Sequence, residues 1–181
     1  MSPDDVKMMS GMILKSGERL QRLIENTVIY SQLELIATDP QKQKALRNHI
    51  LADPADRIMD TAELVASKWT RFEDLRLTLC DGLIRISTEN LTRIIEELVD
   101  NAFKFSEKGS PVTVKTINKE HQYTIIVCDE GRGMSSKQME QIGAFIQFDR
   151  NLHEQQGSGL GLAIVKRLVE MHNGQFNIRS A

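Results

Sequence analysis

The chain has 181 residues, of which 40% are hydrophobic and 27% charged, as is typical of a soluble globular protein. A formal net charge of −2 gives no attraction to nucleic acid or to an anionic membrane surface, and no apolar run approaches the roughly 18 residues that a membrane span needs. We therefore expect no nucleic-acid partner and no direct membrane contact. Cys80 and Cys128 have no metal-ligand spacing, so reduced thiols and a cytoplasmic location are expected.

A long amphipathic helix is predicted at the start of the chain. Ser2 can cap it, Pro3 suits the first helical position, and Asp5 completes a capping box. Apolar residues then recur mostly at intervals of three, four or seven as far as Ala37, and Thr38-Asp39-Pro40 ends the pattern. A helix of about 35 residues is roughly 50 Å long. Because a small domain cannot cover that length, the narrow apolar stripe suggests a bundle or coiled-coil partner.

The segments between 41 and 86 are shorter, and the spacing of their apolar residues changes from helical intervals to alternation. Residues 41–52 give no clear pattern, and a helix begins after Asp53. Beyond it, leucines alternate with polar residues over 75–79, and a second apolar run follows at 83–86. This alternation predicts two short strands paired around a turn.

The following helix carries the sequence ELVDNAFKFS at residues 97–106. Residues three and four apart share a helix face, so one apolar stripe is formed by Leu91, Ile95, Leu98, Ala102 and Phe105. Glu97, Asn101 and Lys104 form a second stripe beside it. A carboxylate, an amide and an ammonium along one edge suit a metal ion and a phosphate. On a lone helix, however, such residues more often form a solvated face with an acid–base pair.

The remaining elements are predicted from apolar runs and turn residues. Strands are expected at 112–117 and 123–128, a short helix from Ser135, a last helix over 158–172, and a further strand at 175–179. The order is a long helix followed by helices mixed with mostly hairpin-type strands. It predicts the α+β class, with a sheet layered on helices rather than a doubly wound sheet.

A second polar cluster, DEGRGM, directly follows the strand that ends near Cys128. Asp129 at a strand end can accept a hydrogen bond from an exocyclic amine, and Gly131 and Gly133 let the backbone approach a flat ring. Taken alone, the same residues also fit a simple turn.

A third cluster of glycines opens the last helix, at positions 157, 159 and 161. Free N–H groups and the positive end of the helix dipole make such a place suitable for phosphate. The segment lacks the GK[ST] of a Walker loop and the spacing of the dinucleotide fingerprint. The long loop before it, 143–156, is of the kind that forms lids or is disordered.

Together these clusters resemble the nucleotide-binding boxes of the sensor histidine kinases, within the ATPase superfamily shared with type II topoisomerases and the ninety-kilodalton heat-shock chaperones. Four segments carry the resemblance: the N box ELVDNAFKFS, the first glycine box DEGRGM, the F box GAFIQFDR and the second glycine box GSGLGLAIVKRL. SGERLQRLIENTVIYSQLEL also resembles the second helix of the kinase dimerisation hairpin. We therefore expect a long helix and linker over 1–52 and an ATP-binding catalytic domain over 53–181, lacking its last strands.

The resemblance implies a two-layer α/β sandwich of the Bergerat type, in which ATP lies between helices and sheet under a mobile lid. It implies that Asn101 ligates the Mg²⁺ that bridges the phosphates and that Lys104 contacts a phosphate. Asp129 would accept a hydrogen bond from the adenine amine. Glu97 stands where hydrolytic members of the superfamily keep a water-activating carboxylate, and it is a candidate catalytic residue.

The glycines have implied roles as well. Gly131 and Gly133 would give the adenine room. The segment that folds over the phosphates as the lid closes would comprise Gly157, Gly159, Leu160 and Gly161.

One part of the kinase pattern is missing, the phosphoacceptor motif H-E-[LI]-[RK]-x-P. None of the 4 histidines stands in that context. We expect the acceptor helix to precede residue 1, to receive the γ-phosphoryl group of ATP and to pass it to an aspartate of a response regulator receiver domain. A homodimer through the helical hairpin of the parent protein is also expected. The alternative is a nucleotide-binding dimerisation or interaction module without phosphotransfer.

Overall fold

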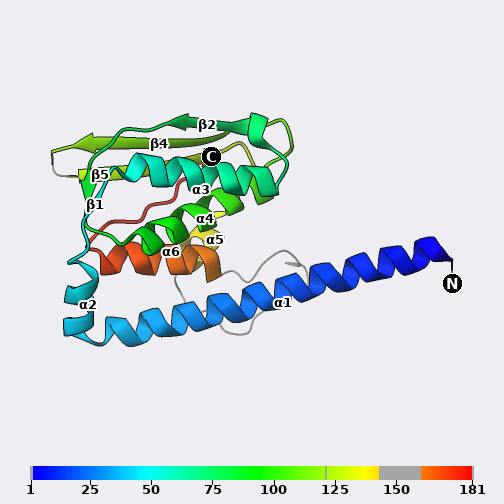
Figure 1. The fold of residues 1–181 in the computed structure, drawn as a ribbon, viewed down its shortest axis with the longest axis horizontal. Coiled ribbons are helices and arrows are strands. Elements are labelled where there is room, and N and C mark those ends of the chain that lie inside the picture. Colours follow the sequence, from blue (N-terminus) through cyan, green and yellow to red (C-terminus); the bar gives the residue numbers. More distant parts are fainter. Residues whose placement is uncertain (1, 121, 143–159, 181) are drawn as a thin grey trace.

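The computed structural model describes residues 2–120, 122–142 and 160–180 (Figure 1). The helices are α1 (Pro3–Ala37), α2 (Pro40–Leu46), α3 (Pro54–Lys68), α4 (Thr88–Phe105), α5 (Ser136–Gln141) and α6 (Leu160–Met171), with a short 3₁₀ helix η1 (Phe72–Asp74). The strands are β1 (Leu51–Ala52), β2 (Leu75–Thr78), β3 (Leu83–Ile84), β4 (Val112–Lys119) and β5 (Gln122–Asp129).

The body of the molecule is a sheet layered on helices. The larger sheet has the order β2-β4-β5, in which β2 and β4 are parallel and β4 and β5 antiparallel. Helix α4 packs against both long strands and against α3 and α6, and α1 packs on the outer side of α6 (Figure 1). This arrangement confirms the predicted α+β class, and it also confirms the hairpin expected between 112–117 and 123–128.

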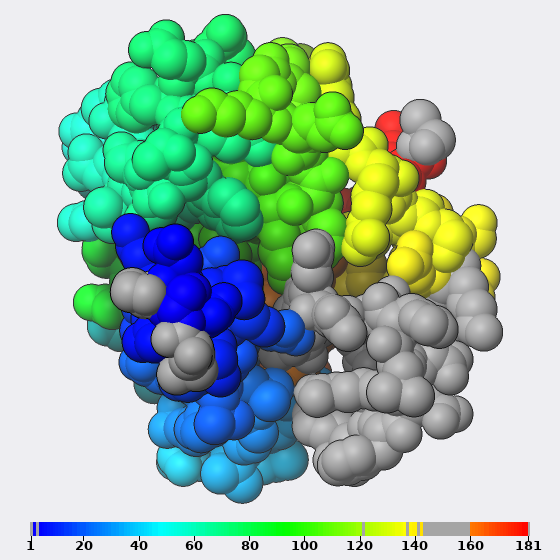
Figure 2. Space-filling view, turned by 90° about the vertical axis from the view of Figure 1, so that its right-hand side faces the viewer, coloured from blue at the N-terminus to red at the C-terminus, as the bar shows by residue number. Residues whose placement is uncertain are grey.

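Helix α1 is the long helix that the sequence predicts. Its capping box is formed, because the Asp5 N–H donates to Ser2 Oγ over 3.1 Å and the Ser2 N–H donates to Asp5 Oδ2 over 2.7 Å. Only its second half packs on the body, where Tyr30 and Leu33 join the core. Along the first half, large apolar side chains stay exposed: Val6, Met8, Met9, Met12, Ile13, Leu14 and Leu20. Figure 2, which looks at the N-terminal end of α1, shows the helix lying below α3 and α4.

Helix α4 is the centre of the core. Ser87 caps it by accepting a hydrogen bond from the Asn90 N–H over 3.2 Å. The predicted apolar stripe is right in part, since Leu98 and Phe105 remain half-buried. The buried face is wider than one stripe, because α4 is covered by helices on one side and by the sheet on the other. It consists of Leu91, Ile94, Ile95, Val99, Ala102 and Phe103.

The two strands predicted at 75–79 and 83–86 are present as β2 and β3, but the predicted pairing between them is wrong. Strand β2 pairs in parallel with β4, and β3 pairs antiparallel with β1, which lies in the 41–52 segment that gave no pattern. The segment after β2 continues beside β4, because the Cys80 N–H donates to Thr116 Oγ1 over 2.7 Å and the Tyr123 hydroxyl donates to the Cys80 carbonyl over 2.7 Å. These bonds hold the chain away from a tight hairpin.

The strand predicted at 175–179 is also wrong. Residues 175–180 are described and form no strand. The segment is instead anchored at its end, where the Met134 N–H donates to Ser180 Oγ over 2.8 Å. The last helix does end as predicted, with Asn173 at a φ of 60° and the Gly174 N–H donating to the Val169 carbonyl over 2.8 Å.

No helix among the described residues is both long enough and apolar enough to cross a membrane.

Candidate functional site

The polar edge of α4 is the first part of the candidate site. Glu97, Asn101 and Lys104 lie on consecutive turns, and all three are half-buried. The side chain of Glu97 is only 15% exposed and forms an ion pair with Arg93, with 2.9 Å between Oε1 and Nη2. The edge is therefore part of a packed surface and not a solvated helix face.

Burial perturbs both charged groups of this edge. It raises the pKa of Glu97, and the Arg93 charge acts in the opposite direction. It lowers the pKa of Lys104, against the effect of Asp100. Burial disfavours the charged form of each group, so an anion beside the Lys104 ammonium would favour its protonated state.

The start of α6 lies against this edge. Gly161 is buried, and a Cβ atom there would overlap the Glu97 carboxylate and lie 3.6 Å from Asn101 Nδ2. Only glycine leaves this space free. The structure thus brings together Glu97 and Asn101 from the N box and Gly161 from the second glycine box, as the sequence analysis expected of one site.

The loop after β5 meets the C-terminal end of α4. The Gly131 N–H donates to Asp129 Oδ1 over 2.9 Å, and the Arg132 N–H donates to the Phe105 carbonyl over 3.3 Å. A Cβ atom at Gly131 would overlap that same carbonyl, and Gly133 has a φ of 66°. Both glycines are therefore required by the backbone, and they set the loop one helical turn beyond Asn101.

Two cations lie over the ring of Phe105, which was predicted only as a member of the apolar stripe. Arg132 lies 4.8 Å and Lys104 5.0 Å from the ring centroid. Such contacts orient cations without pairing them with a carboxylate. The aromatic ring therefore joins the polar edge of α4 to the loop that carries Asp129.

Several residues beside the site were missed. Arg93 precedes Glu97 by four positions, and this spacing is a signal of an ion pair on a helix. Asp100 accepts hydrogen bonds from Arg22 Nη1 over 2.8 Å and from Trp69 Nε1 over 2.9 Å. Arg22 lies on α1 and Trp69 directly follows α3, and no local pattern predicts either partner.

Part of the predicted site lies outside the described residues. Gly157, Gly159 and the F box at 143–150 are in this part of the chain. Of the second glycine box, the structure describes Leu160 and the residues that follow it, with Leu160 half-buried.

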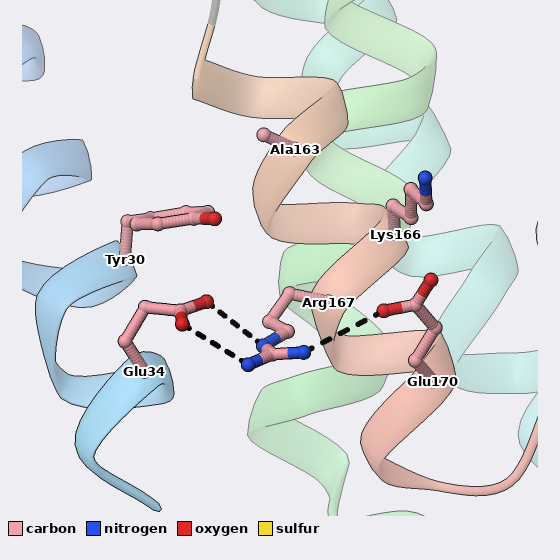
Figure 3. Close-up of a pocket in the computed structure, with 6 residues that line it drawn as sticks. All are labelled: Tyr30, Glu34, Ala163, Lys166, Arg167 and Glu170. Carbon is pink, nitrogen blue, oxygen red and sulfur yellow. Dashed lines mark hydrogen bonds and ion pairs between the residues drawn. The ribbon is translucent and has the colours of Figure 1, made fainter. Parts of the chain in front are cut away.

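A hollow of about 240 Å³ lies elsewhere, between α1 and α6 (Figure 3). Its lining residues are Tyr30, Glu34, Ala163, Lys166, Arg167 and Glu170. Arg167 Nε lies 2.9 Å from Glu34 Oε1, and Arg167 Nη1 lies 3.7 Å from Glu170 Oε2. No residue of the polar edge lines this hollow, so it is not assigned to the nucleotide.

Comparison with known families decides the class of this site. The profile of the family described as histidine kinase-, DNA gyrase B-, and HSP90-like ATPase matches residues 86–181. The chain belongs to this ATPase family. The match includes α4, the loop after β5 and α6, and it confirms the resemblance to a histidine-kinase-type ATP-binding domain.

Individual relatives agree with this assignment. The sensor protein KdpD of Clostridium acetobutylicum is 30% identical over 169 residues, which are 90% of this chain but 18% of KdpD. The mycobacterial sensor histidine kinase MprB is 25% identical with a TM-score of 0.57, covering 69% of this chain and 80% of MprB. The histidine kinase AdeS of Acinetobacter baumannii shares the fold, with 20% identity, a TM-score of 0.66, and coverage of 94% of this chain and 76% of AdeS.

Proposed function

We propose that this chain is the ATP-binding catalytic region of a sensor histidine kinase. The γ-phosphorus of Mg-ATP would lose its bond to the bridging oxygen and gain one to an imidazole nitrogen of a histidine on a separate helix. ADP would leave, and the phosphoryl group would pass to an aspartate of a response regulator. The observation that carries the proposal is the meeting of Glu97, Asn101 and Gly161 beside the start of a helix.

The residues of the site fit a magnesium-bound triphosphate. No cluster of three or more His, Cys, Asp or Glu side chains that could hold a metal ion is found among the described residues. Mg²⁺ does not need such a cluster, because it binds through one or two protein oxygens together with phosphates and water. Asn101 Oδ1 would supply the protein oxygen, and Lys104 would neutralise phosphate charge.

The first turn of α6 would receive the phosphates. Helix N-termini offer unpaired N–H groups and a positive dipole end, and Gly161 keeps the approach open. Gly157, Gly159 and Leu160 would extend this contact. Phosphoryl transfer depends mainly on positioning and charge neutralisation, so these groups supply what the reaction needs.

The adenine would lie at the loop after β5. The Asp129 carboxylate is exposed, and its Oδ1 is held by the Gly131 N–H. A carboxylate fixed in this way can accept a further hydrogen bond from the adenine amine. Gly131 and Gly133 would leave room for the ring.

We also propose the division into a helix and linker, 1–52, and an ATP-binding domain, 53–181. The exposed apolar side chains along the first half of α1 support a second copy of the chain, or another helix of a hairpin, as its packing partner. A homodimer of the parent protein through this hairpin is part of the same proposal.

The test is Mg²⁺-dependent binding of a non-hydrolysable ATP analogue, measured by calorimetry. Asn101→Ala should lower the affinity at least about tenfold in the presence of Mg²⁺ and much less in its absence, because the amide acts through the ion. Asn48→Ala, at an exposed asparagine after α2, is the matched control and should bind normally.

A second arm uses the glycine of α6. Gly161→Ala should weaken binding strongly, whereas Gly17→Ala, where a Cβ atom meets nothing within 4 Å, should not. Equal affinities for Asn101→Ala and the unsubstituted chain would refute the metal role. In a longer chain carrying the acceptor histidine, normal nucleotide binding without histidine phosphorylation would favour the interaction module.

A further inference from the structure

Helix α1 contacts α4 at two residues that lie beside its polar edge, Asp100 and Arg93. Arg22 Nη1 lies 2.8 Å from Asp100 Oδ2, and Arg93 Nη2 donates a hydrogen bond to Asn26 Oδ1. Arg22 and Asn26 are four residues apart and share one face of α1. The long helix therefore meets α4 beside the proposed nucleotide site as well as packing on α6.

The contact at Asn26 continues into the site. The same Nη2 atom of Arg93 lies 2.9 Å from Glu97 Oε1, and the Glu97 carboxylate borders Gly161. Asn26 is 1% exposed, while the Arg93 and Glu97 side chains are 24% and 15% exposed. A largely buried series of contacts thus runs from Asn26 on α1 through the Arg93 guanidinium to the Glu97 carboxylate.

We propose that Arg93 is a positioning residue. Asn26 on α1 orients the Arg93 guanidinium, and the guanidinium in turn holds the Glu97 carboxylate beside Gly161, so the packing of α1 on α4 determines where that carboxylate lies. The inference rests on the proposed function in that it takes the space beside Gly161 to be the nucleotide site. It adds a specific link between the long helix and that site.

The chemistry of the Asn26 amide, the Arg93 guanidinium and the Glu97 carboxylate supports a link that runs from α1 to the site. An asparagine offers Arg93 a neutral acceptor, so the guanidinium keeps its charge available for Glu97. An aspartate at position 26 would instead compete with Glu97 for the same nitrogen. A carboxylate as buried as Glu97 needs a cation or a proton, and Arg93 is the cation that it contacts.

Among the described residues, the strongest further charge effects on the Glu97 carboxyl come from three side chains. Asp100 and Glu96 on α4 favour its protonated form, and Arg22 on α1 favours its charged form. Helix α6 contributes Gly161, which has no charge. If Asn26 no longer holds Arg93, the guanidinium can swing away, and the pKa of Glu97 should rise further above its ordinary range.

The experiment titrates Glu97 directly, by carbon-detected NMR of its carboxyl group in the full 181-residue chain. Asn26→Leu should raise the pKa of Glu97 by about half a unit or more, and Asn26→Asp should raise it further. Gln32→Leu, at an exposed position on α1, is the matched control and should leave it unchanged. Arg93→Lys keeps a cation but loses the planar fork, so it should raise the pKa as well. This variant carries the test if Asn26→Leu does not fold.

Nucleotide binding gives a second measurement, by a double-mutant cycle between Asn26→Leu and Glu97→Gln. Asn26→Leu should weaken binding of the Mg²⁺–ATP analogue about three- to tenfold, with little further loss when Glu97 is already glutamine. The link would be overturned if the pKa of Glu97 were the same in the Asn26 and Arg93 variants as in the unsubstituted chain. Additive losses of nucleotide affinity in the double-mutant cycle would overturn it as well. If the unsubstituted chain binds no nucleotide, the proposed function fails, while the titration still decides the link.

Discussion

Two arginines contact α4 in different ways, Arg71 at its C-terminal end and Arg93 near its middle. At the C-terminal end, Arg71 is 5% exposed and donates to the carbonyls of Phe103, Ser106, Glu107 and Ser110 over 2.5–3.1 Å. Its Nε donates to Asp74 Oδ2 over 2.6 Å, so all of its nitrogens are used.

In the middle of the helix, Arg93 has fewer partners. It contacts Glu97 and Asn26, and its Nε has no hydrogen-bond partner within the part of the chain that the structure describes. A guanidinium saturated by backbone carbonyls fixes a fold, because every alternative position leaves those carbonyls unpaired. A guanidinium shared between two side chains from different helices can be repositioned. The comparison separates a structural arginine from a positioning one.

The largest expected effect on stability comes from removing the Arg71 side chain at the C-terminal end of α4. Arg71→Ala would leave buried carbonyls and the Asp74 carboxylate without their cation, and should lower the free energy of unfolding by about 3–5 kcal/mol. Urea denaturation measures this change. Arg76→Ala is the control, since Arg76 is exposed and bonds only nearby carbonyls, and it should change stability by less than about 0.5 kcal/mol. A loss at Arg71 no larger than at Arg76 would show that the comparison is wrong.

The pH dependence of stability should sharpen the comparison. Arg71 contacts Asp74 and Arg93 contacts Glu97, and the pKa values of these two carboxylates are shifted in opposite directions. The hydrogen bond from Arg71, followed by that from the Gly109 N–H, lowers the pKa of Asp74 below 3.8. Its contribution is thus present above pH 3.8 and lost as the pH falls through the lower folded value. Burial raises the pKa of Glu97 above 4.5, so its contribution is present below pH 4.5 and lost as the pH rises through the folded value.

The measurement is urea denaturation from about pH 3 to about pH 8 for the unsubstituted chain, Asp74→Asn and Glu97→Gln. The advantage of the unsubstituted chain over Asp74→Asn should shrink toward acid. Relative to Glu97→Gln, the unsubstituted chain should lose stability as the pH rises. If the free energy of unfolding changed with pH in the same way for all three proteins, the opposite pKa shifts of Asp74 and Glu97 would be contradicted.

Sequence patterns could predict the parts of the molecule that depend on neighbours along the chain. The capping box of Ser2, the polar edge of α4 and the β4–β5 hairpin are of this kind, and the structure has all three. The partner of β2 could not be predicted in this way, since its parallel pairing with β4 is made across α4. Period alone gives a strand but not its neighbour in the sheet.

The same limit applies to the site. Glu97, Asn101 and Gly161 could be proposed as one site from motif order, but nothing local to Arg22 or Asn26 indicates contact with α4. These contacts depend on where the long helix packs. The alternation of leucines with polar residues over 75–79 predicts a strand, but no comparable pattern in the sequence predicts such long-range pairs. The structure was needed to find them.

The smallest expected effect is at the outer contact between α1 and α4. The Arg22 side chain is 62% exposed, so Arg22→Ala should cost only about 0.2–1 kcal/mol, and Asp100 keeps its hydrogen bond from Trp69. The loss should vanish at about 1 M salt, where screening acts within about 3 Å. Asn26→Leu, at a residue that is 1% exposed, should keep its effect on Glu97 in the same salt. If salt removed both effects equally, the seating of α1 would depend on surface charge alone, and Arg93 would have no separate role.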